Sequence, residues 1–182
     1  MNSRVDLPPG RYQLRVGVRE GGAGETGTVF YDLDVPDFDR EPLTISGLLL
    51  TAPSAQRVMT VQPDETVTKA LPGAAASGRR FTTSDTLALY AEIYAAVGHI
   101  APRIDVTTRL IAESGRDVSV ASDELTGGVT AGQDKSGTYT LQRSLPLKDV
   151  RPWAYLLRVE AQRRGDTERV AVRETPITVL GE

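Results

Sequence analysis

The sequence contains no cysteine and only one histidine. The absence of cysteine excludes disulfide bonds, thiolate nucleophiles and zinc sites built on cysteine, but it does not fix the compartment. The histidine, His99, follows a glycine, and a catalytic histidine needs a nucleophile and an orienting acid nearby. Because the chain has no Gly-x-Ser-x-Gly nucleophile elbow, we interpret His99 as a loop or strand-end residue and predict no catalytic residue.

Lysine is scarce, with three residues among 21 basic ones, and the net charge is −3. Nucleic-acid binding needs clustered lysine and arginine that displace counterions. The arginines are instead spread along the chain and mostly alternate with apolar residues, which is typical of solvated strand faces. We therefore predict no nucleic-acid partner.

Long apolar runs are missing as well. No run reaches the ~18 apolar residues of a membrane helix, so we predict no membrane span in this chain. The opening "MNSRVDLPPG" has one arginine but lacks the apolar segment of a signal peptide. If the protein is exported, we expect the signal to lie outside this chain.

One pattern occurs twice. "LPPGRYQLRV" (Leu7–Val16) has a relative, "VRPWAYLLRV" (Val150–Val159), whose tyrosine lies 143 positions later (155 minus 12). Both segments alternate apolar and polar residues, which predicts half-buried β-strands. A polar turn follows each ("GGAGETG" and "RRGDTER"), and an alternating run returns ("TVFYDLDV" and "VAVRETPITVL"). Each copy is therefore predicted to be the closing hairpin of an antiparallel sandwich.

The alternation also predicts which side chains of the two hairpins point inward. In the first hairpin they are Tyr12, Leu14, Val16, Val18, Val29, Tyr31, Leu33 and Val35. In the second hairpin they are Trp153, Tyr155, Leu157, Val159 and Ala161. We expect Pro176 to mark a bulge or a sheet edge, because proline cannot donate to a ladder.

Tyr12 and Tyr155 occupy matching positions early in their strands. In immunoglobulin-like sandwiches a tyrosine at this place bonds back to the preceding turn and fixes the corner. The order of leucine, proline or glycine, tyrosine and alternating aliphatic residues is similar to that corner and to fibronectin type III domains. We predict a tyrosine corner in each copy.

Between the hairpins, "VPDFDREP" suggests a domain boundary near Asp39. Strands are predicted for residues 43–54, for 103–115 with Ile104, Val106, Thr108 and Leu110 inward, and for 138–147 with Tyr139 and Leu141 inward. Residues 59–80 are long, rich in small residues and aperiodic, which predicts an exposed insertion. Residues 119–137 are predicted to be mostly loop.

Residues 81–99 fit two structures. As a helix, the segment has Ser84 as a cap and Gly98 as a stop, and helix propensity is slightly favourable. As a strand, it places Leu87, Leu89, Ala91 and Ile93 on one face. We choose a strand for 84–97, because every neighbouring segment reads as a strand and tertiary context overrides propensity.

The order of these motifs resembles the region that follows the von Willebrand A-type domain in a group of acidobacterial proteins. The shared features are "PGRY-x-L-x-V", the junction Val35–Phe38, and a later strand matched by Phe81, Leu87, Glu92, Ile93 and Tyr94. The resemblance covers nearly the whole chain and implies an exported protein with a β-sandwich behind an adhesion-like, metal-binding domain. That domain, with its Asp-x-Ser-x-Ser motif, is absent here, and Arg151–Trp153 replaces a Pro-Gly turn, so no metal-site residue is carried over.

Acidic residues offer one candidate metal site. They are Asp32, Asp34, Asp37, Asp39 and Glu41. Calcium prefers six or more oxygen ligands, which interdomain junctions can supply; exposed acids at an edge also discourage strand aggregation, and we favour that interpretation. Asp123, Glu124 and Asp134 are too loosely placed for a site. We predict no metal and no cofactor.

Tyr90 and Tyr94 would point away from the Leu87 face of a strand. They are the best candidates for a contact surface, such as a sugar platform. The alternative is that both pack against the second sheet or the N-terminal hairpin. No pair of carboxylates can be nominated for glycoside hydrolysis, because their separation is not visible in a sequence.

These patterns predict an all-β chain. Residues 1–40 are expected to form a hairpin, the tail of a preceding and incomplete sandwich, and residues 41–182 an immunoglobulin-like antiparallel sandwich. An isolated hairpin is marginal in water, so we expect it to pack on the main domain or on an absent partner segment, and the chain to be a fragment.

The expected function is non-enzymatic. We predict an interaction or spacer module of a larger adhesion-like protein, exported to the periplasm, cell surface or medium, with an unidentified protein partner. The alternatives are a carbohydrate-binding module and a calcium-stiffened accessory domain of an exported enzyme.

Overall fold

The computed structural model describes residues 5–19, 21, 24–38, 40–55, 69, 71–96, 101–126, 129–130 and 136–181. Every element with bounds in these ranges is a β-strand, so the all-β prediction is confirmed. The strands are β1 (Gly10–Arg19), β2 (Thr26–Val35), β3 (Leu43–Ile45), β4 (Leu49–Thr51), β5 (Arg80–Thr82), β6 (Thr86–Ala96), β7 (Ile104–Ala112), β8 (Asp117–Leu125), β9 (Val129–Thr130), β10 (Ser136–Pro146), β11 (Trp153–Arg163) and β12 (Val170–Leu180). None of the described residues belongs to a helix long and apolar enough to cross a bilayer.

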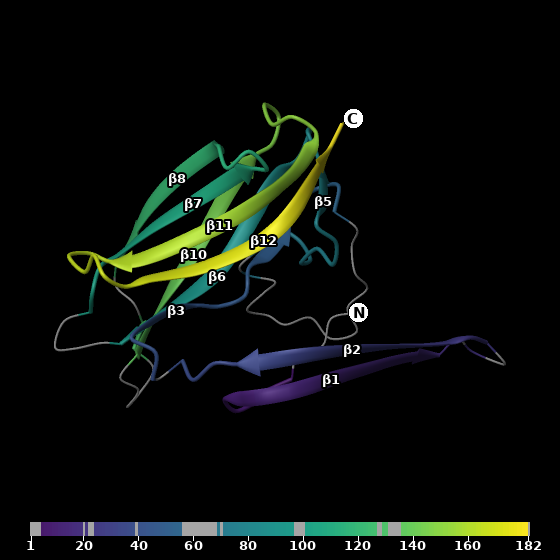
Figure 1. The fold of residues 1–182 in the computed structure, drawn as a ribbon, viewed down its shortest axis with the longest axis horizontal. Coiled ribbons are helices and arrows are strands. Elements are labelled where there is room, and N and C mark those ends of the chain that lie inside the picture. Colours follow the sequence, from purple (N-terminus) through teal and green to yellow (C-terminus); the bar gives the residue numbers. More distant parts are fainter. Residues whose placement is uncertain are drawn as a thin grey trace.

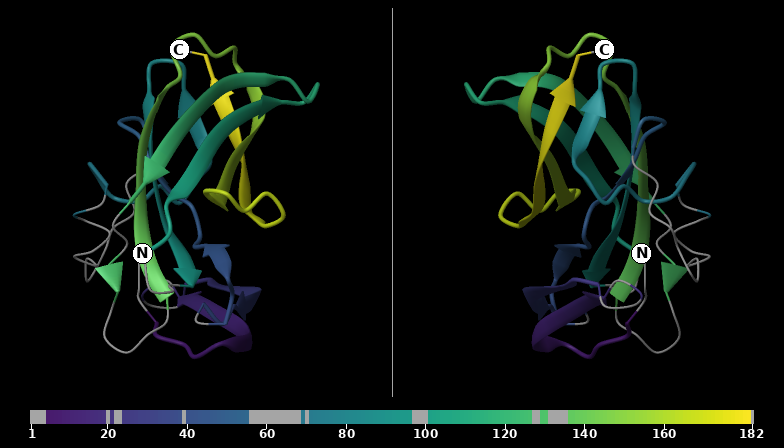
Figure 2. Two further views of the ribbon diagram at one scale, coloured as in Figure 1. Left: turned by 90° about the vertical axis from the view of Figure 1, so that its left-hand side faces the viewer. Right: turned by 90° about the vertical axis from the view of Figure 1, so that its right-hand side faces the viewer.

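Two five-stranded sheets stack to form a sandwich (Figures 1 and 2). One has the order β3-β6-β10-β9, with β4 also pairing with β6, and the other has the order β5-β12-β11-β7-β8. All pairs are antiparallel except β5 with β12. The hairpin β1–β2 forms a sheet of its own and lies beyond one end of the two layers (Figure 2).

The core lies between the two layers and is built from alternate residues of the long strands. Strand β6 contributes Leu87, Leu89, Ala91, Ile93 and Ala95, all essentially inaccessible to solvent. The choice of a strand for 84–97 is thereby confirmed, because β6 pairs with β10 along its whole length. Burial of one strand face between the sheets outweighs the weak preference of this segment for helix.

Several loop predictions need correction. Residues 119–137 are not mostly loop, because they include most of β8, which pairs with β7, all of β9 and the start of β10. Strand β8 is at an edge, and its apolar residues Val118, Val120, Ala121 and Leu125 do not alternate regularly along it, so its sequence lacks the pattern that marks half-buried strands. The strand predicted for 43–54 is split into β3 and β4, which both pair with β6.

Half of the predicted insertion at 59–80 lies outside the described residues. Of its described part, Leu71 is buried and Arg80 begins β5, so the segment is not uniformly exposed as predicted. Pro176 pairs with Leu156 in an unbroken register, at a point where β5 no longer pairs with β12. Pro176 therefore lies at an edge, which is one of the two positions predicted for it.

Thr108 of β7 places a hydroxyl group in the core. Its side chain is fully buried, and its Oγ1 has no hydrogen-bond partner among the described residues. Since a buried polar group without a partner costs about 1–3 kcal/mol, we expect Thr108→Val to raise the free energy of unfolding by about 1 kcal/mol in urea denaturation. Thr107→Val, at the adjacent outward position, is the control and is expected to change little. A Thr108→Val protein no more stable than wild type would contradict the prediction.

Candidate interaction surface

The two hairpins have the same register. Ten consecutive residues pair in each: Gly10–Arg19 with Thr26–Val35, and Trp153–Gln162 with Val170–Val179. Equivalent residues are therefore 143 positions apart in the first strand (153 minus 10) and 144 in the second (170 minus 26). We call β1–β2 the first hairpin and β11–β12 the second hairpin.

Both hairpins have the predicted tyrosine corner. The Tyr12 hydroxyl donates to the carbonyl of Pro8 at 2.8 Å, and the Tyr155 hydroxyl donates to the carbonyl of Arg151 at 2.8 Å. In each case the acceptor lies four residues before the tyrosine. The corner is thus a local feature that forms in both copies, whatever covers the rest of the strand.

The two hairpins differ in what covers their apolar faces. The apolar face of the first hairpin consists of Tyr12, Leu14, Val16, Val18, Val29, Tyr31, Leu33 and Val35. Leu14 is 45% exposed, whereas its equivalent Leu157 is 0% exposed. The same contrast separates Val16 from Val159, which lies in the sandwich core. One pattern of residues is therefore used as a core face in the second hairpin and left open in the first.

Six inward assignments are wrong, because the side chains are exposed: Leu14, Val16, Val18, Val29, Tyr31 and Trp153. Tyr31 is 61% exposed, because no described part of the chain covers the first hairpin on that side. Trp153 is 60% exposed and its indole Nε1 donates to Glu113 Oε2 at 3.0 Å. Strand β7 pairs with β11 only from Tyr155 onward, so Trp153 lies beyond the covered part of the sheet. The hairpin was expected to pack either on the main domain or on an absent partner segment; the exposure of this face leaves coverage by a partner segment as the prediction.

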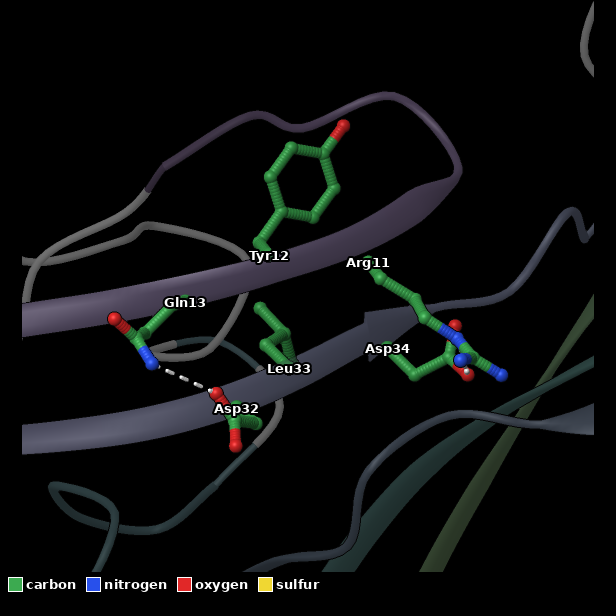
Figure 3. A pocket seen from close by; sticks show the side chains of 6 residues that line it. All are labelled: Arg11, Tyr12, Gln13, Asp32, Leu33 and Asp34. Carbon is green, nitrogen blue, oxygen red and sulfur yellow. Dashed lines mark hydrogen bonds and ion pairs between the residues drawn. The ribbon is translucent and has the colours of Figure 1, made fainter.

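The opposite face of the first hairpin is polar. Figure 3 shows Gln13 and Asp32 on one side of the ribbon and Tyr12 and Leu33 on the other. Gln13 Nε2 donates to Asp32 Oδ1 at 3.2 Å. These residues, with Arg11 and Asp34, line an open hollow of about 470 Å³. The carboxylates of the hollow are already paired, Asp32 with the Gln13 amide and Asp34 with the Arg11 guanidinium. The lining residues therefore do not resemble an acid–base or nucleophilic site.

Arginines follow the same polar face along β1. Arg11 Nε lies 3.8 Å from Asp34 Oδ2, and both side chains are exposed. Arg15 Nε donates to Gln13 Oε1 at 2.9 Å, and its guanidinium carbon lies 5.4 Å from the centre of the Phe30 ring. Arg19 is exposed near the end of the strand. The first hairpin therefore combines an open apolar face with a positively charged edge.

Comparison with known proteins gave no relative. No protein-family model and no curated protein matches this sequence. The surface is therefore interpreted from its own geometry.

The acidic residues proposed for calcium do not gather in the described part of the chain. Asp37 pairs with Arg40 at 3.1 Å, and Asp32 and Asp34 remain on the first hairpin. Within the described residues, no group of three or more histidine, aspartate or glutamate side chains is placed to hold a metal ion. Asp39 lies outside the described residues.

The other residues considered for a site have structural partners or cannot be placed. Asp123 pairs with Arg143 of β10 in the facing sheet, and Glu124 pairs with Arg103, which precedes β7, and with Arg164, which follows β11. His99 and Asp134 lie outside the described residues. Asp123 and Glu124 are therefore both engaged in ion pairs.

Tyr90 and Tyr94 do not form an open aromatic platform. Tyr90 is only 7% exposed, and Tyr94 is half-buried with its ring 4.5 Å from that of Phe38. Both hydroxyls donate to Glu92, from Tyr90 at 2.8 Å and from Tyr94 at 2.5 Å. Burial and this hydrogen bond raise the pKa of Tyr94 well above its ordinary value. The cluster joins β6 to the segment that follows the first hairpin, whereas the expected alternative was packing on the second sheet or on the hairpin itself.

Asp85 is a buried carboxylate that the sequence patterns did not identify. It is 3% exposed and accepts hydrogen bonds from the backbone N–H groups of Ser54 at 3.0 Å and Thr82 at 2.8 Å, and from both hydroxyls. Burial acts to raise the pKa of Asp85, but these hydrogen bonds together hold the pKa below its ordinary value. The spacing of Thr82 and Asp85 around the β5–β6 turn was the available signal. The groups that donate hydrogen bonds to Asp85 come from two loops, so the role of this carboxylate is to join the two loops.

Proposed function

We propose that this chain is a non-enzymatic interaction module in which the sandwich carries the first hairpin and the first hairpin binds a protein partner. The observation that supports this is the open apolar face of the first hairpin, whose equivalent on β11 of the second hairpin (Tyr155, Leu157, Val159 and Ala161) is buried. Exposed contiguous apolar surface of this kind is typical of protein interfaces. An isolated hairpin is also marginal by itself, so a partner would stabilise it.

The sandwich is suited to a positioning role. Its two sheets are closed by contacts between layers, such as Arg173 Nε donating to the carbonyl of Ile45 at 2.8 Å. Phe38, which lies in the segment between the first hairpin and the sandwich, packs on Tyr94 of β6. We further propose, from the resemblance to acidobacterial von Willebrand A-related proteins, that the module is exported and belongs to an adhesion-like assembly.

The alternatives have less support. A carbohydrate-binding module rested on Tyr90 and Tyr94, whose hydroxyls are both held by Glu92 and whose rings offer no flat exposed surface. A calcium-stiffened linker rested on acids of which Asp32, Asp34 and Asp37 pair individually with neighbouring side chains. Neither alternative explains the open apolar face of the first hairpin.

Photo-crosslinking in the cells that make the protein tests the proposal. A benzoylphenylalanine residue would be placed at Val16 or Val29 on the apolar face, and at the exposed Val120 of β8 as the control. We expect the same protein adduct from Val16 and Val29 and none from Val120, read by mass after irradiation. Absence of an adduct from both hairpin positions, or an identical adduct from Val120, would count against the proposed function.

A further inference from the structure

We propose that the outer edge of β1 accepts an antiparallel strand of the protein partner, and that this strand carries carboxylates opposite Arg15 and Arg19. The inference rests on the proposed function and adds the mode of binding and the chemistry of the partner. Addition of a strand to a sheet edge supplies main-chain hydrogen bonds for affinity and leaves alternate side chains to set specificity.

The second hairpin indicates which edge is used. Beyond its pairing with β12, β11 pairs antiparallel with β7 along Tyr155–Arg163. The equivalent edge of β1 has no strand beside it among the described residues. The other edge of the second hairpin pairs with only three residues of β5, so the β1 edge is the longer docking site.

The register of β7 on β11 also predicts which side chains of the added strand would lie opposite which residues of β1. Leu110 of β7 lies opposite Leu157, and Val106 lies opposite Ala161. Aliphatic residues at the same places in a partner strand would therefore extend the apolar face at Leu14 and Val18. Three strands with an apolar face are far more stable than two, so binding and ordering of the hairpin would occur together.

The surroundings of Arg15 indicate which charge the added strand should carry. Its equivalent, Arg158, pairs with Glu160 at 2.8 Å and with Glu174 at 3.0 Å. The residues equivalent to these two glutamates are Gly17 and Phe30. The first hairpin thus keeps the arginine but lacks both carboxylates, and a carboxylate of the added strand would take their place.

A second copy of this chain is a poor occupant of the same edge. Antiparallel pairing of β1 with β1 about Arg15 would place Arg15 opposite Arg15 and Arg11 opposite Arg19. Like charges directly opposite each other destabilise a ladder. The arginine row therefore favours an acidic partner over self-pairing.

Two peptides derived from β7 test the inference, because β7 is the natural neighbour of the equivalent strand. The acidic probe is residues 103–113 with Arg109→Glu, which places a glutamate opposite Arg15 and Asp105 opposite Arg19. The control peptide keeps Arg109. We expect the full chain to bind the acidic peptide roughly fivefold more tightly by fluorescence anisotropy, with slower amide exchange along β1 than along β2.

Charge reversal on the protein provides the matched variant. Arg15 lies on an exposed strand outside the core, so the sandwich of the Arg15→Glu protein should fold normally. The binding preference of this variant should switch to the peptide that keeps Arg109. Equal binding of both peptides, binding of neither up to about 1 mM, or self-association through β1 in sedimentation would overturn the inference. If the crosslink from Val16 persists after such a result, the proposed function stands and only the strand-addition mode fails.

Discussion

Leu157→Ala is expected to lower the free energy of unfolding by about 3 kcal/mol, whereas Leu14→Ala, the equivalent change in the first hairpin, should lower it by less than about 0.5 kcal/mol. Leu157 is fully buried between the two sheets, so its truncation leaves a cavity. Leu14 is exposed, so its truncation removes little contact within the chain. Urea denaturation monitored by circular dichroism measures both values.

Comparison of these two substitutions separates the effect of the local residue pattern from the effect of the side chains packed against it. The two leucines precede the same Arg-Val dipeptide and occupy the same register position. If Leu14→Ala destabilises the sandwich as much as Leu157→Ala does, the apolar face of the first hairpin is covered within this chain, and the proposed interaction surface is wrong.

Asp85→Ala is expected to lower the free energy of unfolding by about 3 kcal/mol, because two backbone N–H groups and two hydroxyls lose their common acceptor. Asp85→Asn keeps one acceptor oxygen and is expected to cost roughly half as much. The carboxylate joins the loop at Ser54 to the β5–β6 turn at Thr82. Thermal and urea denaturation at neutral pH test the order of the two variants.

The pH dependence of the Asp85 effect follows from its lowered pKa. Since the pKa in the folded protein lies below that of the unfolded chain, the unfolded chain binds the proton more readily. The stabilisation is therefore complete above about pH 4 and is lost as the pH falls through the folded pKa. The gap in stability between wild type and Asp85→Asn should narrow below about pH 4, and a gap that stays constant down to pH 3 would argue against this role.

Sequence periodicity predicted most of the fold because strand alternation is a local property. The inward faces of β6, β7 and β10 follow directly from it, with Leu89, Val106 and Leu141 buried as expected. Both tyrosine corners were also predictable, because each needs only one strand and the turn before it. Strand β8 was missed, since an edge strand with polar residues on both sides carries little pattern.

The candidate surface could not be predicted in the same way. Alternation shows that Leu14 and Val16 share a face with Tyr31, but it says nothing about what lies above that face. The same limit explains Trp153, whose exposure depends on where β7 stops pairing with β11. The pairing of Asp85 with Ser54 was equally inaccessible, because their contact depends on how two loops meet in space.

The open ribbon formed by β1 and β2 also bears on solubility. Two bare edges and an aliphatic face are what short segments need to stack into fibrils. Arg11, Arg15 and Arg19 interrupt that tendency as gatekeepers, because each stacked copy would bring their charges together. Neutralising the charge of these arginines by mutation, or screening it with high salt, is therefore expected to make the ribbon a nucleus for aggregation.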